Sequence, residues 1–253
     1  MLRQFLKLTF MEFRVFLREP VAVFFNLFFP LMFLFLTMEV FVPKEYRAMG
    51  LIDIYLPSFF VIIITSVSLF NVPIYIVKYR NQKFLKRLRV APLHPLTILL
   101  SLGLANLLMM LLGLVALVVV GVVIYGARVQ ANPLVLIPVL LLTFGSLGSL
   151  GLLIASFCRG MRTVNIVGQV IYYPMIFLSG AVPLPLGTGW KAIQLTLPAT
   201  YGVDLTQWAW RAGSIPGRQL LLPQTGGPWV DIAVLLGIMI VCLIAATKTF
   251  KWE

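Results

Sequence analysis

Few residues in this chain have the types and spacing that catalysis requires. The single histidine, His94, and the two cysteines, Cys158 and Cys242, form no metal-ligand pattern, and both cysteines lie in or beside apolar runs, which indicates no disulfide framework. The sequence has no HExxH or GxSxG motif, and it has no Gly-Lys pair from which to build a phosphate-binding P-loop. We therefore predict no catalytic residue, no metal ligand and no bound cofactor in this chain.

The chemistry that the sequence does offer is binding through a basic segment, Lys78–Pro95 (KYRNQKFLKRLRVAPLHP). It holds six of the 20 Lys and Arg residues and no acid. Apolar and basic side chains interleave through it, as in a short amphipathic helix that lays its apolar residues into a groove on another protein. A loop that serves only to orient a membrane protein would also be basic. The segment by itself leaves both interpretations open.

The composition identifies the solvent around the chain as lipid. Mean hydropathy is +1.01, 60% of the 253 residues are hydrophobic and only 11% are charged, far from the average of a soluble domain. The net charge of +12 lies between apolar runs, which favours membrane orientation over nucleic-acid binding. We predict one transmembrane domain over residues 1–253.

The first part of the chain, residues 1–19, is predicted to be an interfacial helix. At about 100° per residue, its apolar side chains share one side and four basic side chains share an arc of roughly 60° on the other. Such a helix lies in the membrane surface, either as an anchor alone or as an anchor that also contacts a partner. Glu19-Pro20 should end it, because the residue before a proline disfavours the α conformation. The four basic residues are Arg3, Lys7, Arg14 and Arg18.

Six later runs are apolar and near the roughly 20 residues needed to cross the hydrocarbon. The sequence predicts an all-α, polytopic membrane protein with six transmembrane helices, the N-terminal interfacial helix, a polar loop at Glu39–Gly50, a short loop at Cys158–Thr163, and re-entrant outer helices between spans five and six. The expected spans are Val21–Met38, Leu51–Val77, Leu96–Tyr125, Leu134–Phe157, Val164–Ala181 and Trp229–Thr247.

The distribution of charge predicts the orientation. With six spans, one side of the membrane collects 14 of the basic residues and the other collects 6, so the first side is expected to be cytoplasmic and to hold both termini. The segment between spans five and six, residues 183–228, lies on the poorer side. It carries Trp190, Tyr201 and Trp208, and Trp and Tyr favour the membrane interface.

Four sequence motifs resemble those of the permease subunits of ABC exporters, the ABC type-2 permease class. In "FLKRLRVAPLHPLTILLSLGLAN", Leu85, Arg87, Leu88, Pro92, Leu93 and Pro95 match the family's LxRLxxxPLxP loop between spans two and three. "LREP", Leu17 to Pro20, resembles the junction before the first span. "IYLPSFF", Ile54 to Phe60, resembles the start of the second span, with Ser58 where the family often has Gly. "FLSGAVPLP" at 177–185, followed by "LPATYGVDLTQ" at 197–207, resembles the end of span five and the outer re-entrant segment.

The resemblance implies a dimer of this chain with itself or a related permease, in the inner membrane of a prokaryotic cell. Each subunit would dock a cytoplasmic ATPase that binds ATP and Mg, with the segment 78–95 as the coupling helix and the N-terminal helix as a second contact. No nucleic-acid partner is implied. The expected ATPase-docking residues are Arg80, Lys83, Phe84, Leu85, Arg87, Leu88, Arg89, Arg3, Lys7 and Arg14.

The same resemblance implies a substrate path between the two permeases, lined mainly by spans one, two and five. Ordinary helix packing would account for the same side chains, and for each of them the sequence leaves both roles open. The outer segment is expected to form a gate of Trp190, Tyr201 and Trp208. The candidate path residues are Phe24, Phe28, Asn71, Tyr75, Gln169, Tyr172 and Tyr173.

The sequence is thus identified as a non-enzymatic permease subunit that exports an apolar or amphipathic substrate, such as a lipid, drug or secondary metabolite. Export of a lipid-linked polysaccharide is an alternative within the same class. A secondary carrier or channel is an alternative of another class, but the spans lack the central ionisable residues that ion coupling usually uses. A membrane-embedded lipid enzyme would need paired acids or a His/Cys site, and the sequence offers no recognisable one.

Overall fold

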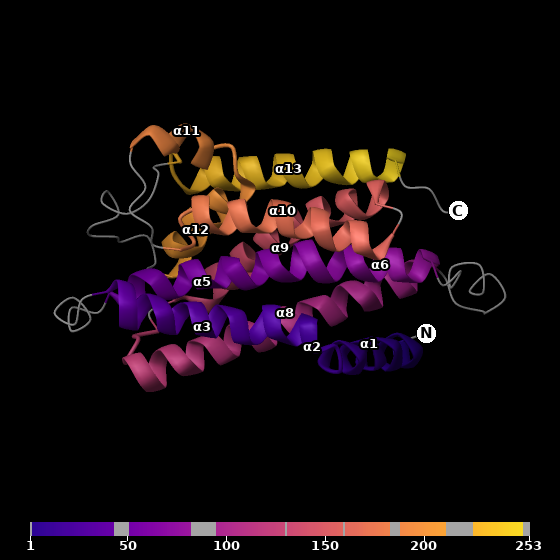
Figure 1. The fold of residues 1–253 in the computed structure, drawn as a ribbon, viewed down its shortest axis with the longest axis horizontal. Coiled ribbons are helices and arrows are strands. Elements are labelled where there is room, and N and C mark those ends of the chain that lie inside the picture. The colour runs from indigo at the N-terminus through magenta and orange to yellow at the C-terminus, as the bar shows by residue number, and fades with distance from the viewer. Residues whose placement is uncertain are drawn as a thin grey trace.

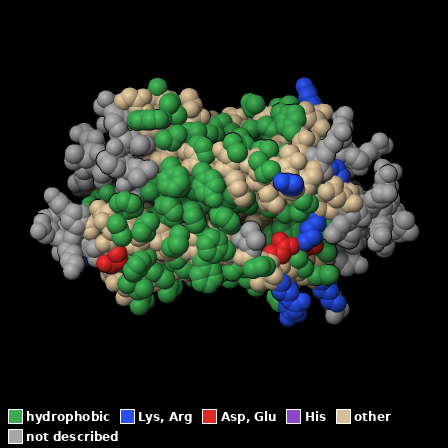
Figure 2. Space-filling model, viewed as in Figure 1, with side chains coloured by type: hydrophobic (Ala, Val, Ile, Leu, Met, Phe, Trp, Pro, Cys, Tyr) green, Lys and Arg blue, Asp and Glu red, His purple; other side chains and the backbone are tan. Residues whose placement is uncertain are grey.

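The computed structural model describes residues 2–42, 51–81, 95–129, 131–158, 160–182, 188–210 and 225–249, and within these ranges every regular element is a helix. The long helices lie side by side along one axis, and the N- and C-termini lie at the same end of the bundle (Figure 1). Figure 2 shows Lys and Arg side chains gathered toward that end and hydrophobic side chains across the middle of the face in view. We call the end that holds the termini the basic end, and the other the opposite end.

The N-terminal helix α1 (Leu2–Leu17) is separated from the first long segment by a short break before Pro20, as the Glu19-Pro20 pair predicts. It packs along α8 and α2. Phe16 from α1 is fully buried, and its ring centroid lies 4.1 Å from that of Tyr75. The helix is therefore attached to the bundle by its apolar side, as an amphipathic helix is expected to be.

The first long segment runs as α2 (Pro20–Val23), η1 (Phe24–Phe28), α3 (Phe29–Leu36) and η2 (Thr37–Phe41). Two of these pieces are π-helical turns, which are rare and short in proteins. The helix continues through Glu39 to Phe41, so the expected polar loop at Glu39–Gly50 begins later than predicted. Residues 43–50 lie outside the described ranges.

The second long segment runs as α5 (Ile52–Ser66), η3 (Val67–Asn71) and α6 (Val72–Asn81). The predicted end at Val77 was wrong, because Lys78–Asn81 continue the helix. Tyr79 has a side-chain partner on α1, and Lys78 has one in the break that follows α1, which explains why this polar turn stays helical against the bundle. The remainder of the basic segment, residues 82–94, lies outside the described ranges.

A π turn sits where Pro73 interrupts the second segment. Proline has no N–H, so the carbonyls of Ser68 and Leu69 lose the donor that residue 73 would supply in π and α spacing, respectively. Two glycines on neighbouring helices face these carbonyls. A Cβ on Gly151 would collide with Ser68 O, and a Cβ on Gly168 would lie 2.9 Å from Leu69 O. Helices α9 and α10 therefore approach this turn closely because they present glycine to it.

The next helices are α8 (Pro95–Tyr125), α9 (Pro133–Phe157), α10 (Met161–Leu178) and α13 (Pro228–Thr249). Helices α8, α9 and α13 begin and end close to the predicted bounds. Helix α10 begins three residues before Val164, so the loop predicted at Cys158–Thr163 is shorter than expected. Gly126, at φ 66°, follows α8, and Asn132 caps α9 by accepting a hydrogen bond from the Leu134 N–H at 3.0 Å.

Five helical segments in the described ranges are long and apolar enough to cross a membrane: Phe24–Phe41, Ile52–Asn81, Leu100–Tyr125, Pro133–Phe157 and Pro228–Thr249. Helix α10, the expected fifth of six spans, is not among them, because its 18 residues include Arg162, Asn165 and Gln169. It nevertheless packs against α6, η3 and α12.

The segment between α10 and α13 contains η4 (Thr188–Trp190), α11 (Lys191–Gln194) and α12 (Pro198–Trp210). Pro198 is the first residue of α12. Helix α12 lies at the opposite end of the bundle (Figure 1), packs against α5, α9 and α13 and buries most of its residues. Residues 183–187 and 211–224 lie outside the described ranges.

Candidate functional site

At the basic end, three contacts join α6 to α1 and to the short break that follows α1. The Tyr79 hydroxyl donates a hydrogen bond to the Glu12 carboxylate. Lys78 Nζ forms an ion pair with Glu19 Oε1 at 2.7 Å. The Phe16 and Tyr75 rings pack between them. Because α6 leads directly into residues 82–94, α1 is fastened to the base of the basic segment.

A fourth contact joins the same turn of α6 to α9. Arg80 donates to the carbonyl of Ala155 at 3.4 Å and to the carbonyl of Cys158. The last carbonyls of a helix lack intrahelical donors and carry partial negative charge. A guanidinium at this position donates hydrogen bonds to them and offsets that charge. Burial raises the pKa of the Cys158 thiol, and the positive charge of Arg80 partly offsets that rise.

The predicted ATPase-docking residues fall into three groups. Lys7 and Arg14 are exposed on α1, and the Arg14 guanidinium lies 4.7 Å from the centroid of the Phe10 ring. Arg80 is turned toward α9, where it has a structural role. Outside the described side chains lie Arg3, Lys83, Phe84, Leu85, Arg87, Leu88 and Arg89.

The predicted path residues also divide by environment. Asn71, Tyr75 and Tyr172 are buried within the bundle, and Tyr75 packs on α1 at the basic end. The other four, on the first span and α10, are exposed to the surroundings: Phe24, Phe28, Gln169 and Tyr173. The seven candidate path residues therefore occupy two different environments in the structure and do not line one surface.

Aromatic rings connect the three segments that carry these residues. The Tyr172 ring centroid lies 4.8 Å from that of Phe70 on η3 and 6.3 Å from that of Phe29 on α3. Nearer the opposite end, Phe33 and Phe177 lie 5.8 Å apart. The first span, the π turn of the second span and α10 thus share one aromatic interface.

Two of the three predicted gate residues, Tyr201 and Trp208, lie on α12, and Trp190 ends η4. Trp190 is exposed, and Tyr201 and Trp208 are half-buried. The Tyr201 hydroxyl donates to the Leu195 carbonyl at 2.8 Å, which ties α12 to the end of α11. Tyr201 and Trp208 both pack against the apolar cluster that contains Leu205.

Several polar side chains that position these elements were not predicted from the sequence. Ser66 Oγ donates to Asn26 Oδ1 at 2.8 Å, joining the first two spans. Gln207 Nε2 donates to Ser58 Oγ at 2.5 Å, joining α12 to α5.

The contacts of Glu12 and Glu19 with α6 were not predicted either. The sequence did offer one signal for them: the two acids are seven residues apart, a spacing that places both on one face of a helical path.

The comparison with protein families decides the class. The family model for the ABC-2 type transporter matches residues 3–209, most of the chain. The chain belongs to the ABC-2 type transporter family. No curated protein matches it.

Membership confirms the predicted resemblance, and together with the apolar helices it makes this ABC-2 chain a multi-pass membrane component of an ABC transporter. The match extends through α12 and ends before α13. It therefore includes the basic segment and the part of the outer segment that carries the motif at 197–207.

Proposed function

We propose that this ABC-2 chain is the permease subunit of an ATP-driven exporter, which spans the membrane six times with both termini in the cytoplasm and works as a dimer. A separate ATPase subunit at the basic end binds and hydrolyses ATP. The substrate is apolar or amphipathic, such as a lipid, drug or secondary metabolite; a lipid-linked polysaccharide is an alternative cargo.

The observation that supports this proposal is that side-chain contacts hold the end of α6 against its neighbours at the basic end. An ATPase that moves residues 82–94 would pull directly on α6, and Lys78, Tyr79 and Arg80 link α6 to α1 and α9. Movement of the basic segment would therefore shift three helices together. An ordinary topology loop has no need for such a rigid base.

The α6 helix continues through η3 to the aromatic interface with α3 and α10, which gives the movement a route to the substrate. We propose that the exposed Phe28, Gln169 and Tyr173 face the substrate between two permeases, and that the buried Asn71 and Tyr172 position them. Aromatic and uncharged polar side chains suit an apolar or amphipathic cargo.

Co-purification with candidate ATPase subunits tests the proposal. The double variant Arg87→Glu/Arg89→Glu should lose the complex or its permease-dependent ATPase activity, because it reverses two charges in the proposed docking helix. The matched control is Arg128→Glu/Lys191→Glu, which reverses two charges at the opposite end and should keep the complex. Well-folded protein that binds no ATPase, or a double variant that retains full coupling, would favour an ATP-independent carrier or channel.

A further inference from the structure

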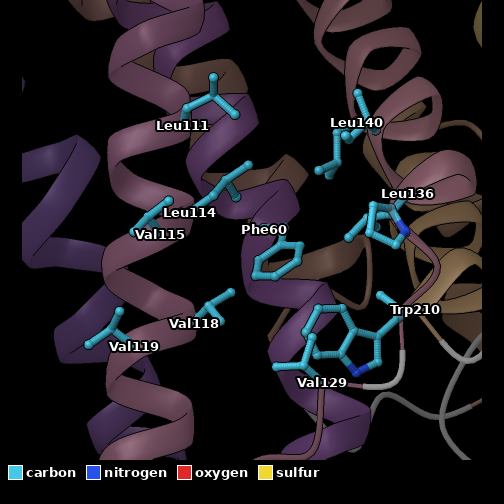
Figure 3. A pocket seen from close by; sticks show the side chains of 13 residues that line it. Phe60, Leu111, Leu114, Val115, Val118, Val119, Val129, Leu136, Leu140 and Trp210 are labelled. Atoms are coloured by element: carbon cyan, nitrogen blue, oxygen red, sulfur yellow. The ribbon is translucent and has the colours of Figure 1, made fainter.

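An apolar pocket of about 290 Å³ opens between α8 and α9, near the roughly 300 Å³ lower limit of typical small-molecule sites. In Figure 3, side chains from α8 face those from α9 across the pocket, and Phe60 of α5 lies between them. The lining includes no charged residue. The pocket lies apart from the aromatic interface of α3, η3 and α10 that the proposed path uses.

The pocket has a buried floor and an exposed rim. Phe60, Leu114, Leu140 and Trp210 form the floor and are almost completely buried. On the rim, Val115 of α8 is 61% exposed and Ile137 of α9 is 55% exposed. Since α8 and α9 both have the length and composition of membrane-crossing helices, this rim opens to the hydrocarbon of the bilayer rather than to water.

The pocket is elongated along the helices. Its α8 side runs from Leu111 to Val119, about 12 Å along the helix, and Val129 and Trp210 close it toward the opposite end of the bundle. An elongated apolar slot that begins near the end of the spans and extends toward their middle fits a hydrocarbon chain lying parallel to the helices.

Trp210 forms the outer end of this wall. Its side chain is 1% exposed, and its indole N–H has no hydrogen-bond acceptor among the described residues. In Figure 3 the nitrogen lies on the side of the ring toward Val129, at the outer end of the slot. That nitrogen is itself enclosed by protein, so the ring meets the slot with its apolar atoms, and a chain that lies along the slot has its ester group at the outer end, where the headgroups of the leaflet lie.

We propose that this pocket binds one acyl chain of a glycerolipid from the membrane leaflet at the opposite end of the bundle. The methylenes occupy the slot between α8 and α9, and the ester group lies beside Trp210. This lipid is a resident of the transporter rather than its cargo, and it supports α12 where that helix packs on α5 and α9. The proposal rests on the membrane location of α8 and α9 and not on ATP-driven export.

Quenching of tryptophan fluorescence by brominated phosphatidylcholine tests the site. In a variant that keeps only Trp210, the other four tryptophans being replaced by Phe, vesicles of dibromostearoyl phosphatidylcholine should quench emission relative to dioleoyl phosphatidylcholine. A variant that keeps only Trp229, which is highly exposed, gives the quenching of an open lipid-facing ring. Trp210 should approach that value despite its burial.

Filling the slot provides the matched comparison. Val118→Phe places a ring in the pocket and should reduce quenching of Trp210. Val123→Phe, on an exposed position of α8 that does not line the pocket, should leave it unchanged. If the single-tryptophan protein folds poorly, the difference in quenching between the native chain and Trp210→Phe reports the same ring. Unquenched Trp210, or quenching that Val118→Phe does not alter, would overturn the proposal.

Discussion

Two glycines on α9 differ in the space that surrounds them. Gly151 faces the carbonyl of Ser68 in the π turn so closely that a methyl group has no space. Gly148, one turn earlier on the same helix, has no atom within 4 Å of an added Cβ, although it is also buried. The two residues therefore have different reasons for being glycine, and substitution separates them.

We expect Gly151→Ala to destabilise the protein by about 1–3 kcal/mol, the usual range for overpacking, because backbone on one side of the contact must move. Gly148→Ala should be neutral or slightly stabilising, since alanine favours helix. Thermal unfolding of both variants in the same detergent measures the difference. Equal unfolding temperatures would contradict the close approach of α9 to η3.

A second residue-scale prediction concerns Arg80, which is expected to contact the ATPase and which donates to the end of α9 in the structure. Arg80→Met should lower the stability of the isolated subunit by about 1 kcal/mol, the typical net value of a hydrogen bond. Lys7→Met removes a charge from the same end of the bundle but from an exposed side chain, and should leave stability unchanged. If Arg80 served docking alone, neither substitution would alter thermal unfolding without the ATPase.

At the scale of elements, the attachment of α1 to α6 depends on a buried acid. Tyr79→Phe removes the donor to Glu12, which stays buried against the bundle. We expect a loss of about 1–3 kcal/mol, the cost of an unsatisfied buried group. The control Tyr173→Phe removes a hydroxyl from an exposed ring. Thermal unfolding compares the pair, and a tryptic digest should show earlier cleavage in α1 of Tyr79→Phe only.

The elements were largely predictable because lipid requires helices, and apolar runs reveal them. The bounds of α8, α9 and α13 followed from hydropathy, although each helix also includes the proline just before the predicted span. The end of α6 did not, since Lys78–Asn81 look like loop unless their partners Glu12 and Glu19 are known. Glu39 was assigned to a loop for the same reason: a charge ends an apolar run but does not end a helix.

The candidate site was less predictable than the fold, because side-chain direction depends on packing. Tyr75 and Gln169 looked alike as polar residues within apolar spans, yet one is buried against Phe16 and the other is exposed. The π turns also left no clear pattern in the sequence. Only Pro73 indicated an interruption near η3, and it did not indicate which helices would approach there.

For the whole molecule, the six-span topology requires that α10 cross the membrane. In a chain with Cys158 and Cys242 replaced by Ser, we expect Lys191→Cys to react with a membrane-impermeant maleimide added to intact cells. Arg162→Cys should react only after the membrane is permeabilised, because it lies at the other end of α10. Labelling of both positions from the same side would contradict a crossing by α10 and the six-span topology.

Because the two termini lie at the same end of the bundle, two copies of the chain can be joined in tandem. The ends of α1 and α13 meet the same side of the bundle, and α13 touches α9 there through Thr249 and Ser156. Two copies can therefore be encoded as one polypeptide whose linker never has to traverse the bilayer. Such a tandem chain fixes the stoichiometry at two and allows a substitution to be placed in one half only, so that the contribution of each half to transport becomes separable.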